Sequence, residues 1–294
     1  MVGGSGFIGR RLVERLIDRG ICVRVVSRRA EGDADSAPQM ERVAGSIEDS
    51  ATIRRAVEGA SAVVNLVGTT TAKTEQQFYS LHCDSPARLA AAARDAGVKR
   101  FVHVSAMGIS LDAPSIADRS KAAGEHAVRE AFPDVNLVRP ALVYGPGDHF
   151  FTRFSQLARS APAIPLIGGG RTRFQPMHVD DVAEAMARVL ERPATAGRAF
   201  ELGAGEIFSF RELIERLCGA IERRPWLVPI PFPLAEAGAY LTQWLPHALL
   251  TVDQVRLLKT DKVIRDPGSA PAALNMRPRP LGAFLSELAR QYGR

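Results

Sequence analysis

The sequence has few cysteines, no recognisable export signal and no concentrated block of charge. Its three cysteines, Cys22, Cys83 and Cys218, lie far apart and form neither a CxxC pair nor a metal-ligand spacing with histidine. Neither a disulfide framework nor a zinc site is therefore indicated, and no metal is expected. A basic segment followed by an apolar segment and a cleavage site is also missing. These features favour a cytoplasmic protein.

The most apolar C-terminal stretch, 226–250, does not have the pattern of a membrane-spanning helix. Four prolines and Glu236 interrupt it, so an uninterrupted spanning helix is excluded. Tyr240, Trp244 and nearby leucines could instead form an amphipathic face that contacts a partner or a membrane surface, while core packing is the alternative. A peripheral position on the inner face of a membrane is compatible with this pattern.

The net charge of +6 and the pI of about 9.6 do not by themselves indicate nucleic-acid binding. Basic residues are scattered along the chain and acidic residues are interleaved with them. Neither a DNA-reading helix nor an aromatic and basic sheet surface is evident. We therefore expect a solvated basic surface and no nucleic-acid partner.

Short apolar segments alternate with helical patterns, which is typical of a parallel sheet with helical crossovers. Strands are predicted at 22–27, 62–67, 100–105 and 136–139, and helices at 8–19, 50–58, 76–96 and 118–131. This order predicts an α/β fold, a Rossmann doubly wound parallel sheet.

The pattern becomes less regular after Pro140, with loops rich in glycine and proline and helices predicted at 182–190 and 210–221. We expect residues 1–150 to form the NAD(P)-binding Rossmann domain. Residues 151–294 then supply the remaining Rossmann elements and a small C-terminal lobe for a substrate or partner. Residues 266–280, rich in proline and alanine, have the composition of a surface linker.

The first strand of the predicted sheet is apparently truncated. A Rossmann sheet needs a central strand just before its glycine loop, yet only Met1 and Val2 precede Gly3. Without that strand, backbone groups in the middle of the sheet would lack partners. Either the natural start lies upstream or other segments fill the gap, and we favour a shortened N-terminus.

The glycine-rich segment GGSGFIG at 3–9 leads directly into an amphipathic helical pattern. Gly3 permits a tight turn, Gly6 lets the backbone approach a pyrophosphate, and Gly9 allows close helix packing. Free N–H groups at the start of the helix favour an anion. A turn that only reverses the chain is the alternative. The residues predicted to contact the nucleotide here are Gly3, Ser5, Gly6, Phe7, Ile8 and Gly9.

The end of the next predicted strand indicates which nucleotide is preferred. A carboxylate at that point would bind the ribose hydroxyls of NAD and repel a 2′-phosphate, and none follows 23–27. Ser27, Arg28 and Arg29 could bind the phosphate instead. NADP(H) is therefore the preferred cofactor and NAD(H) an alternative. Val67 and Gly68 are expected on the far side of the phosphates.

Three motifs together resemble extended and atypical short-chain dehydrogenases of the NAD-dependent epimerase/dehydratase type: GVKRFVHVS at 97–105, RPALVYGPGD at 139–148 and QPMHVDDV at 175–182. Further segments make the chain similar to the nucleotide-binding accessory subunits of respiratory complex I and their bacterial relatives: SKAAGE at 120–125, AFPD at 131–134, LTVDQV at 250–255 and LKTD at 258–261. The resemblance covers the whole chain.

The resemblance implies an active-site tyrosine four residues before a lysine, one helical turn apart. Here Lys121 is present, but position 117 is alanine. Lys121 is expected to contact the nicotinamide ribose, near Pro140, although it has no phenol to activate. Ser105 is a weak candidate for the catalytic hydroxyl, and a hydrogen bond to the backbone is its alternative.

Other residue types that often act in catalysis have structural explanations. Tyr79 or Tyr144 could supply a phenol only if the fold brings it to the nicotinamide. Tyr144 follows a strand at the edge where ligands bind, so it is expected either to line the substrate pocket or to pack against Pro146. His178 and Asp180 precede a helix, and Asp180 or its neighbour is expected to cap that helix.

Three hypotheses for function follow. The first is a non-catalytic or weakly catalytic NADP(H)-binding accessory or assembly factor that docks through its C-terminal region on a membrane-bound respiratory complex. The second is an oxidoreductase or epimerase that acts on a small molecule, for example in quinone metabolism. The third is a sensor of the NADP(H) redox state. The fold alone does not decide among them.

Overall fold

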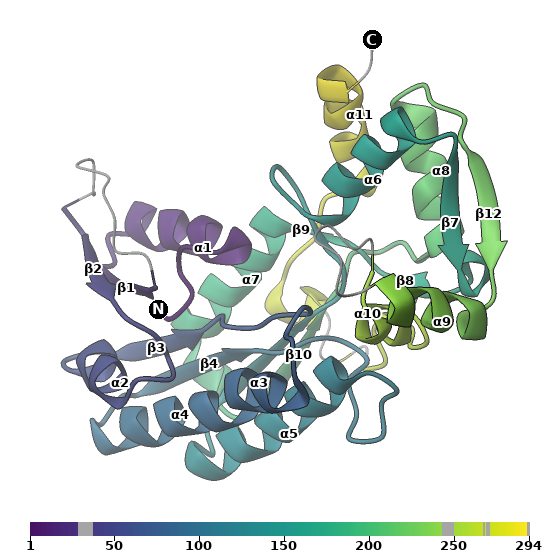
Figure 1. Cartoon of the computed structure of the whole chain (residues 1–294). Helices are drawn as coiled ribbons and strands as arrows, with labels where there is room; N and C mark the ends of the chain where they lie inside the picture. The colour runs from purple at the N-terminus through teal and green to yellow at the C-terminus, as the bar shows by residue number, and fades with distance from the viewer. Residues whose placement is uncertain (29–37, 243–249, 267, 269–270, 293–294) are drawn as a thin grey trace.

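A computed structural model describes residues 1–28, 38–242, 250–266, 268 and 271–292 (Figure 1). Its main sheet is parallel, in the order β2, β1, Val2, β3, β4, β5, β10. The bounds of these strands are β1 (Val23–Ser27), β2 (Met40–Ala44), β3 (Ala62–Asn65), β4 (Arg100–Val104), β5 (Asn136–Pro140) and β10 (Ala199–Leu202). The order confirms the doubly wound Rossmann sheet.

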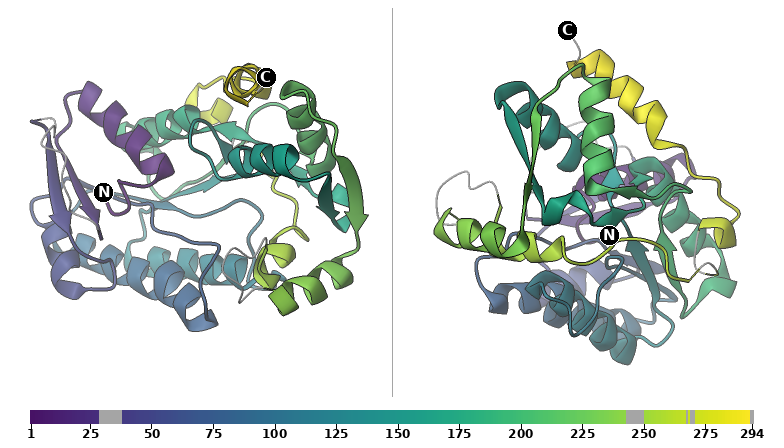
Figure 2. Two further views of the ribbon diagram at one scale, coloured as in Figure 1. Left: turned by 45° about the horizontal axis from the view of Figure 1, so that its top comes forward. Right: turned by 90° about the vertical axis from the view of Figure 1, so that its right-hand side faces the viewer.

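Helices cover both faces of this sheet (Figure 2). On one face α1 (Phe7–Asp18) packs with α7 (Val179–Glu191), and their apolar side chains meet those of β4 and β5 in one core. The opposite face carries α2 (Ser50–Val57), α3 (Glu75–Tyr79), α4 (Ser85–Asp95) and α5 (Ile116–Ala131) over a second core. Both faces are thus buried, as a parallel sheet requires.

Val2 occupies the central position of the sheet, between β1 and β3. It forms parallel bridges to Val26 of β1 and to Asn65 of β3. The Val2 N–H donates to the Val64 carbonyl at 2.9 Å, and the Leu66 N–H donates to the Val2 carbonyl at 2.9 Å. At the position of the expected first strand, this one paired residue keeps the neighbouring backbone groups hydrogen-bonded.

Two local features differ from the sequence prediction. The edge strand β2 was not predicted, because its side chains are mostly exposed and show no apolar alternation. The predicted helix at 76–96 is divided into α3, a π-helical stretch (Ser80–Asp84) and α4. The π-helical stretch lies against α5 at Gly124, where a methyl group would overlap the carbonyl oxygen of His82.

The second lobe is built from short strand pairs and helices around an aromatic core. Its strands pair as β6 (Val143–Tyr144) with β9 (Met177–His178), β7 (Ala163–Ile167) with β12 (Trp226–Ile230), and β8 (Arg173–Phe174) with β11 (Phe208–Ser209). Its helices are α6 (Phe150–Ser160), α8 (Phe210–Ala220), α9 (Phe232–Thr242), α10 (Val252–Leu257) and α11 (Leu281–Tyr292).

The proline-containing stretch that starts at residue 226 forms β12 and then α9, which begins just after Pro231. Trp244 lies outside the described residues. Of the helices within the described ranges, none is long and apolar enough to cross a membrane. The expected linker contains a short 3-10 turn, Pro271–Leu274, whose Leu274 is buried, and Arg188 of α7 donates to the Leu274 carbonyl at 3.0 Å.

We predict that Gly124→Ala lowers the free energy of unfolding by about 1–3 kcal/mol, because the added methyl group must displace the π-helical backbone. Urea unfolding followed by circular dichroism measures the change. Gly219→Ala in α8 is the matched control, since its methyl group would meet nothing within 4 Å, and helix propensity favours alanine there. Equal stability of the two variants would contradict this account of the packing.

Candidate nucleotide and ligand site

The glycine loop between Val2 and α1 has the geometry of an anion site. Gly3 adopts a φ of +81°, which glycine accommodates without strain. Gly6 caps α1 without any side-chain hydrogen bond, and no acidic residue lies in the first turn. The positive end of the helix is thus left for a ligand. At Gly9, a methyl group would lie 2.5 Å from the Gly3 carbonyl oxygen, so the loop requires glycine there.

A cavity opens over this loop, and Val67 and Gly68, the two residues expected near the phosphates, line it on the sheet side. Gly3, Ser5 and Gly6 also line it, whereas Phe7, Ile8 and Gly9 form the first turn of α1 beside it. The remaining lining residues are Val2, Val26, Ser27, Arg28, Gly45, Ser46, Ile47, Glu48, Leu66, Thr69, Thr71, Ala72, Lys73, Gln77 and Leu81. The cavity therefore joins the loop to the ends of β1 and β3.

The charges around this cavity are mostly positive. Ser27 and Arg28 lie at its edge where β1 ends, and Lys73 lines it from the opposite side. Arg29 lies outside the described residues. Glu48 is the one carboxylate among the described lining residues, and its oxygen accepts a hydrogen bond from the Ser80 hydroxyl at 2.8 Å. A nucleotide phosphate fits this charge balance.

Two buried histidines lie near the site, and one of them, His82, connects the loop after β3 to α5. The Thr69 N–H donates to Nε2 of His82 at 3.0 Å, and Nδ1 of His82 lies 2.8 Å from the Ser120 hydroxyl. His103 pairs with the Asn65 amide at 3.0 Å. Burial, together with nearby positive charge, lowers the pKa of His82 to about 3, and burial lowers the pKa of His103 to about 4. Both rings are therefore neutral near pH 7.

The position expected for a catalytic tyrosine lies at the buried start of α5. Ala117 is fully buried, and the carboxylate of Asp253 accepts hydrogen bonds from the N–H groups of Ile116 at 2.5 Å and Ala117 at 3.1 Å. Asp253 comes from α10, 136 residues away in the chain. The N-terminus of α5 is thus occupied by an internal carboxylate, which satisfies two of its free N–H groups.

Lys121 lies one turn further along α5 and lines a second cavity together with Pro140. Burial is the main cause that lowers the pKa of Lys121, and the charge of Lys262 adds to the effect, while Asp118 opposes it. Ser105 is buried at the end of β4, and its hydroxyl has no hydrogen-bond partner among the described residues. The backbone hydrogen bond weighed as an alternative for Ser105 is therefore not formed.

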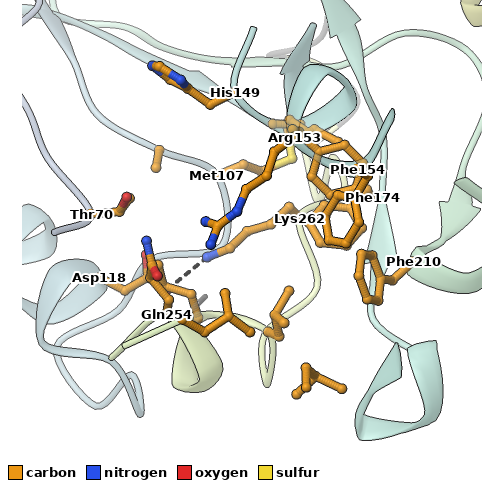
Figure 3. Close-up of a pocket in the computed structure, with 18 of the residues that line it drawn as sticks. Thr70, Met107, Asp118, His149, Arg153, Phe154, Phe174, Phe210, Gln254 and Lys262 are labelled. Atoms are coloured by element: carbon orange, nitrogen blue, oxygen red, sulfur yellow. Dashed lines mark hydrogen bonds and ion pairs between the residues drawn. The ribbon is translucent and has the colours of Figure 1, made fainter. Parts of the chain in front are cut away.

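The second cavity has a volume of about 420 Å³ and lies between the sheet edge and the second lobe (Figure 3). Three of its charged residues were not identified from the sequence. Asp118 is buried, and its Oδ2 forms an ion pair with Nζ of Lys262 at 2.7 Å. Arg153 of α6 points toward this pair (Figure 3). Asp118 was recognisable as the neighbour of Ala117, but no local signal places Lys262, 144 residues away, at this site.

The tyrosines do not supply the missing phenol. Tyr144 is fully buried in the aromatic core of the lobe, where it packs against Phe151, His178 and Phe284 rather than lining the cavity. Of the two expectations for Tyr144, a place in the pocket and packing, the structure shows a packed ring, because the lobe folds around it. Tyr79 on α3 does not line the cavity either.

The start of α7 is capped by a different residue from the one predicted. His178, and not an aspartate, caps the helix by accepting a hydrogen bond from the Asp180 N–H at 3.2 Å. Asp181 instead accepts hydrogen bonds from the backbone and side chain of Arg279. Within the described part of the chain, no three histidine, cysteine or acidic side chains are grouped as metal ligands.

The low pKa values of the histidines predict acid sensitivity. Below pH 6.5 the unfolded chain binds protons that the folded chain does not, so stability is lost as the pH falls, by up to about 1.4 kcal/mol per pH unit for each histidine. In His82→Gln the free energy of unfolding should fall less steeply between pH 6.5 and 4. His126→Gln, at an exposed position of α5, is the control. An unchanged slope in His82→Gln would refute the assignment.

Comparisons with known proteins agree with this geometry. The model of the NAD dependent epimerase/dehydratase family matches residues 1–203. Subunit 9 of the NADH dehydrogenase [ubiquinone] 1 alpha subcomplex of Arabidopsis thaliana is 32% identical, with 99% of this chain and 76% of the relative aligned. The ceramide reductase of Caulobacter vibrioides is 30% identical, with 93% of this chain and 87% of the relative aligned.

Solved structures show the same fold. The dTDP-glucose 4,6-dehydratase of Streptomyces venezuelae, solved with NAD bound, has a TM-score of 0.78 at 23% identity and covers 99% of this chain and 95% of its own. MoeE5, solved with UDP-glucuronic acid and NAD, has a TM-score of 0.76 at 21% identity and covers 99% and 98%. With its glycine loop, its sheet order and these matches, the chain belongs to the NAD dependent epimerase/dehydratase family.

Proposed function

We propose that this chain is an NADP(H)-binding accessory protein that holds its nucleotide without the usual tyrosine-dependent proton transfer. The observation that carries this proposal is the buried Ala117 one turn before Lys121. The proposed nucleotide contacts are the loop at 3–9, Val67 and Gly68, with Lys121 and Pro140 near the nicotinamide. Bound nucleotide would also stabilise the fold by mass action.

The preference for NADP(H) over NAD(H) rests on the charges at the end of β1. Arg28 faces the cavity, and a guanidinium forms charge-assisted hydrogen bonds with a phosphate. Ser27 supplies a hydroxyl at the same edge. A carboxylate that would accept the ribose hydroxyls of NAD is absent from the described residues at this strand end.

We assign the partner role to the second lobe. Several relatives are named as subunits of a mitochondrial NADH dehydrogenase, which supports association with a respiratory complex. Docking at the inner face of the membrane is part of the proposal. On α9, Leu234 and Leu241 are 65% and 71% exposed, seven residues apart on one helical face, while Ala235 and Ala239 are buried on the other. Exposed apolar side chains of this kind mark interaction surfaces.

A second candidate is an NADP(H)-dependent reductase of a small molecule. The cavity beside Lys121 and a relative named ceramide reductase favour it. Lys121, Asp118 or a water molecule would then supply the proton that the missing phenol cannot. The two candidates differ in one observable: only the reductase oxidises bound NADPH when a substrate is added.

Calorimetric titration of the whole chain tests the nucleotide assignment. We predict that NADPH binds at least tenfold more tightly than NADH, and that Arg28→Ala weakens NADPH binding by about tenfold, or about 1.4 kcal/mol, because it removes a charged phosphate contact. NADH binding should not change, and Arg54→Ala on α2 should alter neither. Equal affinity for the two nucleotides would contradict the NADP(H) assignment.

Absorbance at 340 nm tests the accessory role with the same protein. NADPH should stay reduced when quinone-like, long-chain carbonyl or sugar-nucleotide compounds are added, since position 117 offers no phenol. Steady oxidation with any of these compounds would favour the reductase instead.

Membrane co-sedimentation tests the docking face. We predict that the double variant Leu234→Asp and Leu241→Asp is lost from membranes that carry the respiratory complex, because charges replace the apolar contact. Leu111→Asp, also at an exposed apolar position but next to α5, is the matched control and should sediment like the natural protein. Unchanged sedimentation of the double variant would exclude this face.

A further inference from the structure

The cavity beside Lys121 has two chemically different ends. In Figure 3 the charged heads of Arg153 and Lys262 point toward Asp118, while Phe154 and Phe174 gather with another ring on the opposite side. The apolar lining is completed by Met107, Leu142, Phe150, Leu157, Pro165, Ile167, Phe210, Leu250, Leu257 and Leu258. We propose that this cavity binds a single-chain amphiphile, with its hydrocarbon among the aromatic rings and an anionic oxygen head beside Arg153 and Lys262.

The charge balance favours an anionic head. Lys121, Arg153 and Lys262 line the cavity, and among the described lining residues Asp118 is the one carboxylate. The lining thus holds three cationic side chains and one carboxylate, and Asp118 forms an ion pair with one of the three, Lys262, at 2.7 Å. An anion that enters this low-dielectric end gains charge-assisted hydrogen bonds, whereas a cation would meet like charges.

The other end favours hydrocarbon and not sugar. Phe154 from α6, Phe174 from β8 and Phe210 from α8 present ring carbon, and Leu258, which follows α10, packs against the same cluster. The hydroxyl groups of a hexose placed there would lose their hydrogen bonds to water without replacing them. A volume of about 420 Å³ is within the range of roughly 300–1,000 Å³ usual for small-molecule sites.

The position of the head relative to the nucleotide also follows. Thr70, Lys121 and Pro140 line the cavity where it approaches the glycine-loop cavity, which Thr69 and Thr71 line. The head would thus lie between the aromatic end and the nicotinamide. This orientation rests on the proposed nucleotide function, whereas binding of the amphiphile does not require turnover.

The experiment is calorimetric titration of the whole chain with three probes below their micelle concentrations: dodecanoate, dodecyltrimethylammonium and UDP-glucose. We expect dodecanoate to bind at least tenfold more tightly than the cationic probe and UDP-glucose not to bind. Arg153→Gln should weaken dodecanoate binding by about fivefold to tenfold, whereas Arg171→Gln, at an exposed position of the same lobe, should not. Leu157→Trp, which fills the aromatic end, should weaken dodecanoate binding while thermal unfolding shows a folded protein.

Two results would overturn the proposal. One is equal affinity for dodecanoate and dodecyltrimethylammonium, and the other is a higher affinity for UDP-glucose than for dodecanoate. NADPH affinity, measured in the same Arg153→Gln protein, separates this proposal from the nucleotide assignment. If Arg153→Gln binds NADPH normally but binds dodecanoate more weakly, the amphiphile site is supported. If the natural protein does not bind NADPH, the nucleotide function is refuted, and the dodecanoate titrations alone then decide whether the amphiphile site exists.

Discussion

The first turn of α5 is the constraint on which the site depends. Its N–H groups are bound by Asp253, and its Asp118 is paired in the protein interior with Lys262. Removing one partner of a buried ion pair commonly costs about 3–5 kcal/mol, because the remaining charge has no compensation. Both partners of α5 follow residue 250, so the last part of the chain fixes the helix that carries Ala117 and Lys121.

This arrangement separates two functions that occur together in most dehydrogenases. The nucleotide half keeps what binding requires: a glycine loop at a helix N-terminus, a positive strand end and a sheet edge. The part of the site around α5 has Ala117 where a catalytic tyrosine was expected, and the carboxylate of Asp253 accepts a hydrogen bond from the Ala117 N–H. The structure therefore keeps the glycine-loop cavity and the cavity beside Lys121 although position 117 carries no phenol.

The sequence predicts the Rossmann elements well because their information is local. The buried strands are rich in valine and other apolar residues, and the glycine loop is defined by backbone needs that only glycine meets. Edge strand β2 escapes prediction since residues such as Glu41 face solvent. The π-helical stretch escapes as well, because it depends on contact with Gly124, 40 residues or more away.

The candidate site is predicted less completely, and the reason is again physical. Gly3, Val67 and Lys121 are recognised because motifs place them at strand and helix ends. Asp253 and Lys262 reach the site only through the packing of the second lobe on the sheet, which local patterns do not encode. For Tyr144 the motif position leaves open whether the ring lines a pocket or packs, and the aromatic core around it decides its orientation.

The proposed function requires that the chain retain a nucleotide and that this nucleotide be NADP(H). Mass spectrometry of the small molecules released from protein purified without added cofactor identifies what is retained. We predict NADP⁺ or NADPH in near-equimolar amount, with little NAD(H). Release of NAD(H) in near-equimolar amount would contradict the role assigned to Arg28 and Ser27.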